Sequence, residues 1–311
     1  MELSLLLLKQ ILSMTVMVLA GWIMARRGLL NCEESRIVSR VVIYILTPAA
    51  LLDGFQTELD TNKLEGLLAS LIGAVLIYAV FLGGTWLMGR GRRPLSAGEQ
   101  ACVVYSNSGN LIIPIIINTL GSEYVIYSCA YLLVQNLLTW THGQVLLGGS
   151  RGLRVKTVVT NPCLCGIALG LFMFLMGLRL PGPVGGAVSS LGACLGPISM
   201  LVIGVMLAEA DLKRAFASPA VYRVILLRLA AYPLLAALIL WGMVQVWPGE
   251  VTGALTVTLL CAIGPSATTL TQMAQLYENP ESGYMSSINA VTTILCAVTM
   301  PVMIFLFQQM N

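Results

Sequence analysis

The sequence predicts an all-α polytopic membrane protein with ten transmembrane helices, arranged as two inverted repeats of five helices each. Three observations lead to this prediction. First, 57% of the 311 residues are hydrophobic and only 10% are charged, whereas soluble domains average about 25% charged residues. Second, the chain divides into ten apolar stretches, each close to the roughly 20 residues that cross a bilayer as a helix. Third, two prolines of the first half recur in the second half at a nearly constant offset.

The ten stretches follow one another with short connections, which leaves no room for a soluble catalytic domain. The first stretch is followed by Arg26 and Arg27. A cleavable signal peptide carries its positive charge before the apolar region, so we expect this stretch to remain as the first transmembrane helix. In order, the predicted segments 1 to 10 are residues 4–25, 36–55, 65–88, 98–119, 124–147, 160–178, 186–207, 220–247, 252–273 and 284–307.

Basic residues collect in the odd-numbered connections and their flanks. Cytoplasmic loops of membrane proteins are enriched in lysine and arginine, so we expect these connections inside the cell and both termini on the non-cytoplasmic side of the cell membrane. The net charge is only +3, and the basic residues lie in turns rather than on one face. This pattern does not indicate a protein that binds nucleic acid. Of the 17 basic residues, those near odd-numbered connections are Arg26, Arg27, Arg36, Arg40, Arg90, Arg92, Arg93, Arg151, Arg154, Lys156, Lys213, Arg214, Arg223 and Arg228.

Two proline landmarks indicate an internal repeat. Pro197 follows Pro48 by 149 residues, and Pro265 follows Pro114 by 151 residues. The halves are then residues 1–150 and 151–311. Because five is an odd number of crossings, the second half enters the membrane in the opposite sense, which is typical of secondary transporters. The alternative is a chance match, since membrane helices often contain proline.

Segment 4 is polar in its middle. Asn107 lies about 14 Å into the segment at 1.5 Å per residue, close to the midplane, and Asn110 follows it. Pro114 lacks an N–H group and clashes with the carbonyl of Asn110, so we expect the helix to break there. Irregular backbone at membrane depth is tolerated where it is buried in protein or lines a wet cavity. The other interpretation is that the asparagines join helices by hydrogen bonds across their interfaces.

Segment 9 has the same combination of a proline interruption and nearby polar residues, because Gly264 and Pro265 interrupt it and polar residues follow. Neighbouring segments 5 and 10 add further polar groups at depth, whereas segments 1, 2, 6 and 7 have fewer. This clustering of polar groups in segments 4, 5, 9 and 10 indicates a mobile transport bundle beside a less polar scaffold. The predicted substrate-binding residues are Asn107, Asn110, Pro114, Gln135, Asn136, Gly264, Pro265, Ser266 and Thr268.

Charged residues at membrane depth are nearly absent. We expect Arg228 to reach the cytoplasmic face, because the apolar run after it is already long enough to span. Asp53 and Glu209 end segments 2 and 7, where an interfacial position or a part in proton coupling are both open. His142, near the inner end of segment 5, is expected at the interface.

We predict no catalytic residue, no metal and no cofactor. A membrane-embedded enzyme needs a nucleophile and base or paired acids at depth, and the sequence has neither. Cys163 and Cys165 are too close together and too isolated for a zinc framework, and a single histidine supports no metal site. The protein is therefore not expected to be an enzyme.

Three stretches resemble the auxin efflux carrier family, which includes plant PIN-type carriers and compact bacterial permeases. SNSGNLIIP in segment 4 resembles the family's Asn-x-Gly-(Asn/Phe)-x-x-x-Pro motif. GPSATTLTQMAQLY in segment 9 is similar to its Pro-x-Ala…Tyr stretch. SINAVTTILCAVTMPVM resembles its closing helix, which ends in Thr-x-Pro, here Thr299 and Pro301. The resemblance covers the whole chain in length and segment count.

The resemblance implies two inverted five-helix repeats, with segments 4 and 9 broken at prolines and crossing near the midplane. It also implies that segments 1, 2, 6 and 7 form a scaffold and the interface of a homodimer, beside a transport bundle of segments 3, 4, 5, 8, 9 and 10. The transported molecules would be organic anions such as small carboxylates. By motif position, Asn107, Asn110 and Pro114 fall at the crossing of segment 4 and Pro265 at that of segment 9. Where the family pattern has an asparagine in segment 9, this chain has Ser266 and Thr268.

We therefore expect a secondary transporter of small organic anions that works by alternating access in the lipid bilayer. Half-helices that begin after the breaks offer free N–H groups and about half a positive charge each, which favours an anion. The alternatives are a ligand sensor, which binds without transport, and a channel, whose flux does not saturate.

The charge bias of the connections makes a testable prediction about topology. Reporter fusions after Arg93 and Gly149 should read as cytoplasmic, and a fusion after Asn311 should read as external. A cytoplasmic C-terminus would contradict the odd number of crossings per half, and the inverted repeat with it.

Overall fold

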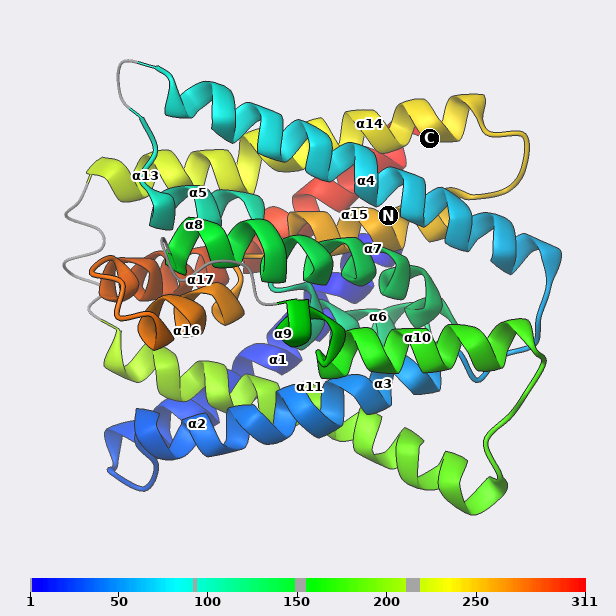
Figure 1. Cartoon of the computed structure of the whole chain (residues 1–311), viewed down its shortest axis with the longest axis horizontal. Coiled ribbons are helices and arrows are strands. Elements are labelled where there is room, and N and C mark those ends of the chain that lie inside the picture. Colours follow the sequence, from blue (N-terminus) through cyan, green and yellow to red (C-terminus); the bar gives the residue numbers. More distant parts are fainter. Residues whose placement is uncertain (1, 92–93, 149–154, 211–218) are drawn as a thin grey trace.

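The computed structural model describes residues 2–91, 94–148, 155–210 and 219–311. The described chain is helical and contains one isolated β-bridge but no strand. Long helices run roughly alongside one another, with shorter broken helices between them (Figure 1). The all-α fold class that the sequence predicts is therefore confirmed.

Helices occupy every predicted segment of the first half. Segment 1 is one helix, and segment 2 is a continuous helical span with a π-helical turn in its middle. Their bounds are α1 Glu2–Arg26, α2 Cys32–Val41, η1 Val42–Leu46, α3 Thr47–Gly54, α4 Thr61–Gly89, α5 Ala97–Val104, η2 Ser108–Ile112, α6 Ile113–Thr119, η3 Ser122–Tyr124, α7 Val125–Leu138, η4 Thr139–Gly143 and α8 Gln144–Gly148.

The second half is helical in the same way, and segment 9 is again divided. Its bounds are α9 Val155–Val159, α10 Pro162–Leu175, α11 Gly182–Glu209, α13 Pro219–Leu226, η6 Leu227–Ala231, α14 Tyr232–Val246, α15 Thr252–Ile263, α16 Thr268–Leu276 and α17 Ser282–Met310. Within the described residues, six helices are long and apolar enough to cross a membrane. They span Leu5–Arg26, Glu33–Gly54, Thr61–Gly89, Gly182–Ala208, Pro219–Val246 and Ser282–Met310.

Three prolines stand directly after π-helical turns instead of breaking their helices. Pro48, Pro114 and Pro233 are each the second residue after such a turn, in α3, α6 and α14. At each turn an N–H donates to the carbonyl five residues back, for example from Ile113 to Ser108. The wider turn takes up one extra residue and moves a carbonyl away from the proline ring, so the helix continues past the proline.

The structure corrects the predicted position of the break in segment 4. We expected it at Pro114, but α5 ends at Val104 and the helix resumes at Ser108 and runs to Thr119. The break is the extended stretch 105–107. Sequence reasoning placed it wrongly because a π-turn accommodates Pro114. In segment 9 the break falls at 264–267, at the predicted Gly264-Pro265.

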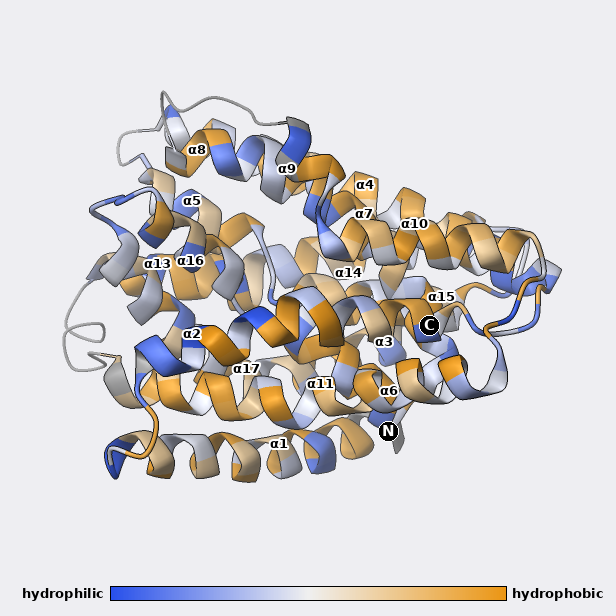
Figure 2. Cartoon of the chain, turned by 60° about the horizontal axis from the view of Figure 1, so that its bottom comes forward, coloured by the Kyte–Doolittle hydropathy of each residue, from blue (hydrophilic) through white to orange (hydrophobic). Residues whose placement is uncertain are grey.

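Apolar side chains cover the outer surface of the helices. Leu12, Val16 and Leu19 of α1 are each more than half exposed, with Val16 at 67%. Figure 2 shows hydrophobic residues along α1, α10 and α11, and hydrophilic residues gathered at the turns. A surface of this kind matches a hydrocarbon environment, where apolar side chains need not be buried in protein.

Arg26 ends α1, Arg90 follows α4, and Arg36 and Arg223 lie near the starts of the helical spans that begin with α2 and α13. These helix ends lie together at one end of the molecule, here called the basic end. It is the left side of Figure 1, where α1 and α4 end and α2 and α13 begin. Both chain termini lie toward the opposite end in Figures 1 and 2.

Helices α1 and α11 pack backbone to backbone through two glycines. A Cβ on Gly204 would lie 2.1 Å from the carbonyl oxygen of Val18, and one on Gly21 would lie 2.2 Å from that of Leu201. Small residues allow this close approach between helices in a membrane. The contact joins segment 1 to segment 7.

We predict that Gly204→Ala destabilises the protein by about 1–3 kcal/mol, because the backbones of α1 and α11 must move apart. The measurement is the thermal unfolding midpoint in detergent. The control is Gly242→Ala in α14, where a Cβ would meet no atom of the described residues within 4 Å and alanine favours the helix by up to about 1 kcal/mol. Equal midpoints in the two variants would contradict the tight contact.

Candidate functional site: the crossover of the two broken helices

The two breaks pass each other in opposite directions and pair through their backbones. The Asn107 N–H donates to the Pro265 carbonyl at 2.8 Å, and the Ala267 N–H donates to the Tyr105 carbonyl at 3.0 Å. These two bonds form the antiparallel bridge between Ser106 and Ser266. We call the stretches 105–107 and 264–267 the crossover.

Carbonyls left free at the break in segment 4 are bound by side chains from the other break and from α7. Ser266 Oγ donates to the Cys102 carbonyl at 2.7 Å, which ties segment 9 to the end of α5. Gln135 Nε2 in α7 donates to the Ser106 carbonyl at 2.9 Å. Buried backbone carbonyls need hydrogen-bond donors. Because the helices stop at the crossover, no following helical turn supplies N–H groups, and side chains donate instead.

Gln135 also joins three segments through its amide oxygen. Tyr78 Oη of α4, Ser106 Oγ and Ser108 Oγ each lie within hydrogen-bond distance of Gln135 Oε1, at 2.8, 2.8 and 2.6 Å. Both polar atoms of this amide are therefore used within the protein. Gln135 lines the cavity beside the crossover, and its bonds hold the crossover in place.

Arg228 does not reach the cytoplasmic face, so that expectation was wrong. Its side chain is 0% exposed, and it lies in η6 with five hydrogen bonds to carbonyl oxygens. Nε and Nη2 donate to Gly264 at 2.9 and 2.6 Å, and Nη2 donates to Ala262 at 2.8 Å. Nη1 donates to Val103 at 3.1 Å and to Val104 at 3.4 Å. Hydropathy cannot reveal this position, because the partners are backbone atoms of other segments.

A cavity of about 60 Å³ lies next to the crossover, and we call it the crossover cavity. By the usual size criterion it has room for a few water molecules. No charged side chain is among the described residues that line it. Its polar lining comes from Thr47, Ser106, Asn107, Asn110, Gln135, Asn136, Asn161 and Thr269.

Three helices begin at this cavity. The run η2–α6 starts just after Asn107, α16 starts at Thr268, next to the lining residue Thr269, and α10 starts at Pro162, next to Asn161. Asn161 Oδ1 caps α10 by accepting a hydrogen bond from the Leu164 N–H at 3.1 Å. Helix N-termini carry partial positive charge, so the wall of the cavity favours negative charge.

The Asn107 side chain has an unused hydrogen-bond donor. Asn107 is only 4% exposed, and its Nδ2 is buried without a hydrogen-bond partner in the described chain. An unpaired buried amide costs about 1–3 kcal/mol. A ligand that accepts a hydrogen bond in the crossover cavity would remove this cost.

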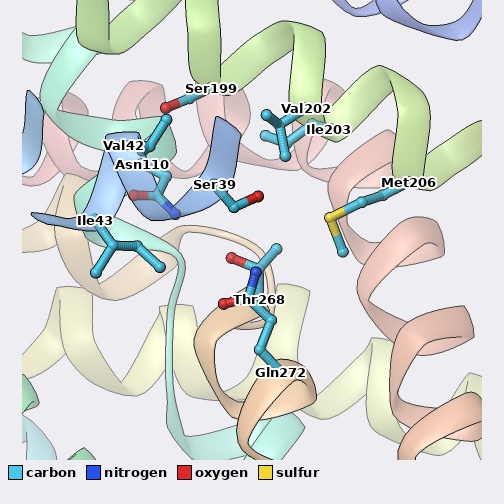
Figure 3. A pocket seen from close by; sticks show the side chains of 10 residues that line it. All are labelled: Ser39, Val42, Ile43, Asn110, Ser199, Val202, Ile203, Met206, Thr268 and Gln272. Carbon is cyan, nitrogen blue, oxygen red and sulfur yellow. The ribbon is translucent and has the colours of Figure 1, made fainter. Parts of the chain in front are cut away.

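A second cavity, here called the side cavity, lies between segments 2 and 7 on one side and segment 9 on the other. Figure 3 shows Ser39, Asn110 and Ser199 across from Thr268 and Gln272 of α16. Asn110 and Ile43 line both this cavity and the crossover cavity. The amide of Asn110 and the hydroxyl of Thr268 make no hydrogen bond within the described residues.

From the side cavity the space continues toward the basic end. A larger cavity of about 200 Å³, here called the vestibule, shares Ser39, Met206 and Gln272 with the side cavity. Arg36 lines it and is exposed. It is the one charged side chain among the described residues that line these three cavities.

The predicted site residues divide into two groups. Asn107, Asn110, Gln135 and Asn136 line the crossover cavity, and Thr268 lines the side cavity. The other four line neither cavity: Gly264, Pro265 and Ser266 provide atoms for the hydrogen bonds of the crossover, and Pro114 packs against Gly196 of α11, where an added Cβ would lie 3.1 Å from the proline ring.

Sequence reasoning missed several polar residues of the cavities. Thr47, Asn161 and Ser199 come from segments 2, 6 and 7, in which we expected fewer polar groups at depth. Ser199 Oγ is buried without a partner in the described chain, as is Nδ2 of Asn289, which lines a small neighbouring cavity with Thr268. Asn161 before Pro162 is a recognisable helix start, but that signal says nothing about what the helix end faces.

The remaining titratable candidates lie as follows. His142 is half-buried in η4, and its Nδ1 lies 2.9 Å from the hydroxyl of Tyr105, the first residue of the break. Asp53 is half-buried in the last turn of α3, and Glu209 is the last residue of α11.

Comparison with known proteins agrees with a transport role. A family model described as "Membrane transport protein" matches residues 6–156 and 150–304. The chain is 30% identical over 303 residues to an uncharacterized transporter of Methanothermobacter thermautotrophicus (strain Delta H), and the match covers 94% of this chain and 95% of the relative. The chain therefore belongs to the membrane transport protein family, that of the auxin efflux carriers, and is a multi-pass membrane transporter.

Proposed function

We propose that this transporter carries small organic anions, most simply carboxylates, and binds them in the crossover cavity. The observation that carries the proposal is Nδ2 of Asn107, which is buried without a partner in the described chain, in a cavity with no charged side chain among its described lining residues; Asn107 itself is 4% exposed. A carboxylate accepts hydrogen bonds from amide N–H groups, and a charged acceptor makes them stronger. The three helix N-termini around the cavity add a favourable field.

Alternating access is supported by where the cavities lie. The side cavity and the vestibule follow the boundary between α2 and α11 on one side and α16 and α17 on the other. That boundary separates the proposed scaffold from the proposed transport bundle. Movement of the bundle along it would close the vestibule and open the other end.

Two inverted five-helix repeats account for the paired breaks. Segments 4 and 9 each break once, and the breaks pair antiparallel at the crossover. With short connections and an odd number of segments per half, the two halves run in opposite senses through the membrane. In this arrangement, with both termini external, the vestibule with Arg36 faces the cytoplasm.

We predict that Asn107→Ala weakens carboxylate binding by about 1–3 kcal/mol, because one hydrogen bond to a charged group is lost. Binding is measured by thermal shift and calorimetry in nanodiscs, against a panel of mono- and dicarboxylates. The control is Asn118→Ala in α6, whose amide donates to the Pro114 carbonyl at 2.8 Å and lines neither cavity.

The proposed site is wrong if Asn107→Ala and Asn110→Ala both bind the carboxylate as the wild type does. Flux into liposomes then separates the remaining classes of function. Saturating flux indicates a carrier, linear flux indicates a channel, and binding without flux indicates a sensor.

We further propose a homodimer formed through the outer face of α11. The first half of this helix exposes small side chains, among them Gly186, Ser189, Ser190 and Ala193. Such a face allows close packing of helices in lipid.

In nanodiscs the mass should therefore be that of two chains, and Ala193→Trp should shift it toward one. Leu238→Trp, on an exposed position of α14, is the control and should leave the dimer intact. A monomer at every protein concentration would refute the interface.

A further inference from the structure

The buried guanidinium of Arg228 binds the carboxyl-terminal ends of both helices that stop at the crossover. Val103 and Val104 are the last residues of α5, and Ala262 and Gly264 flank the end of α15. Arg228 donates to all four carbonyls over 2.6–3.4 Å. One side chain thus joins the ends of two helices from different halves of the chain, and it does so from a third segment.

No acidic side chain in the described chain forms an ion pair with Arg228. The ion pairs found there join Arg179 to Glu58 and Arg223 to Glu99. A buried charge without compensation is costly in a membrane protein. The compensation here is the pair of helix C-termini, which carry about half a negative charge each and together about match one guanidinium.

This arrangement leaves the positive charge of the nearby helix N-termini without an opposing negative charge. Helix C-termini next to the N-termini of η2–α6 and α16 would oppose their positive field. Because Arg228 neutralises the ends of α5 and α15, the two N-termini retain about one positive charge in total. Asn107, Gly109 and Asn110 from the start of η2–α6 and Thr269 from the start of α16 line the crossover cavity.

We propose that Arg228 is the positioning residue that sets the charge preference of the site. It does not line the crossover cavity or the side cavity. It acts by binding the C-termini of α5 and α15 and by cancelling their partial negative charge. The cavity then prefers an anion over a neutral molecule of the same shape. This role rests on the proposed function. Lysine keeps the charge but lacks the planar fork that spans two chains.

The test compares carboxylates with their uncharged amides in the purified full chain. Binding of succinate, succinamide, benzoate and benzamide is measured in nanodiscs for the wild type, Arg228→Gln and Arg228→Lys. The control is Arg223→Gln, which removes a positive charge from the same segment near the basic end, where Arg223 pairs with Glu99 at 2.6 Å. It should keep the wild-type preference.

We expect Arg228→Gln to lower the carboxylate-to-amide affinity ratio by about tenfold or more, as for loss of a charged interaction, and Arg228→Lys to retain most of it. An equal loss for carboxylate and amide in Arg228→Gln would mean that Arg228 only holds the structure, and would overturn the proposal. Loss of the ratio in Arg228→Lys as large as in Arg228→Gln would also overturn it. A wild type without preference for either carboxylate would refute the proposed function, and the charge role with it.

Hydrogen exchange gives a second measurement that needs no ligand. Amides in residues 101–108 and 260–268 should exchange faster in Arg228→Lys and Arg228→Gln, because neither side chain can join both helix ends. Amides of α1 are the internal reference and should be unchanged. Unchanged exchange at both breaks in Arg228→Lys would overturn the bridging role even if Arg228→Gln fails to fold.

Discussion

The structure depends on satisfying the backbone of two helices that stop inside an apolar protein. A helix end leaves carbonyls without partners, and in a membrane no water is present to bind them. Here the Ser266 hydroxyl donates a hydrogen bond to the carbonyl of Cys102. Arg228 donates to the carbonyls of Val103 and Val104, and the Gln135 amide donates to that of Ser106. The two breaks also bind each other through the two backbone hydrogen bonds of the Ser106–Ser266 bridge. These partners satisfy backbone groups at the points where segments 4 and 9 stop.

The partners come from one set of segments, and the far wall of the cavities comes from another. Tyr78 of α4, Gln135 of α7, Arg228 of η6 and Thr292 of α17 all bind the crossover or the residues that hold it. Thr47, Asn161 and Ser199 belong to segments 2, 6 and 7 and face the cavities from across the boundary. A bundle that carries its own crossover can move as a unit against the second set without exposing unpaired backbone. This division gives a physical basis for the proposed alternating access.

Polar residues at the same depth therefore have different roles, which their hydrogen bonds distinguish. The side-chain nitrogen and oxygen of Gln135 and the hydroxyl of Ser266 each have hydrogen-bond partners within the protein, and these bonds stabilise the crossover. Asn107 uses its backbone N–H for the crossover but keeps its side-chain Nδ2 unpaired beside a cavity. The sequence presents all three as polar residues near a break. Of the three, Asn107 is best suited to bind a ligand, because its Nδ2 has no partner at all in the described chain.

The sequence by itself determined the helical membrane fold, because the lengths of the apolar stretches match a bilayer whatever their arrangement. It also located the break in segment 9, since Gly264 and Pro265 oppose a helix by their local chemistry. It placed Asn107 and Asn110 beside the cavity through their motif. The position of the break in segment 4 was decided by the tertiary structure, where a π-turn tolerates Pro114 and the pairing of the two breaks fixes residues 105–107. The same is true of Arg228, whose partners are carbonyls from residues 34 to 125 positions away. Composition and periodicity describe side chains along one segment, and they carry no information about which distant backbone atoms a buried charge will bind.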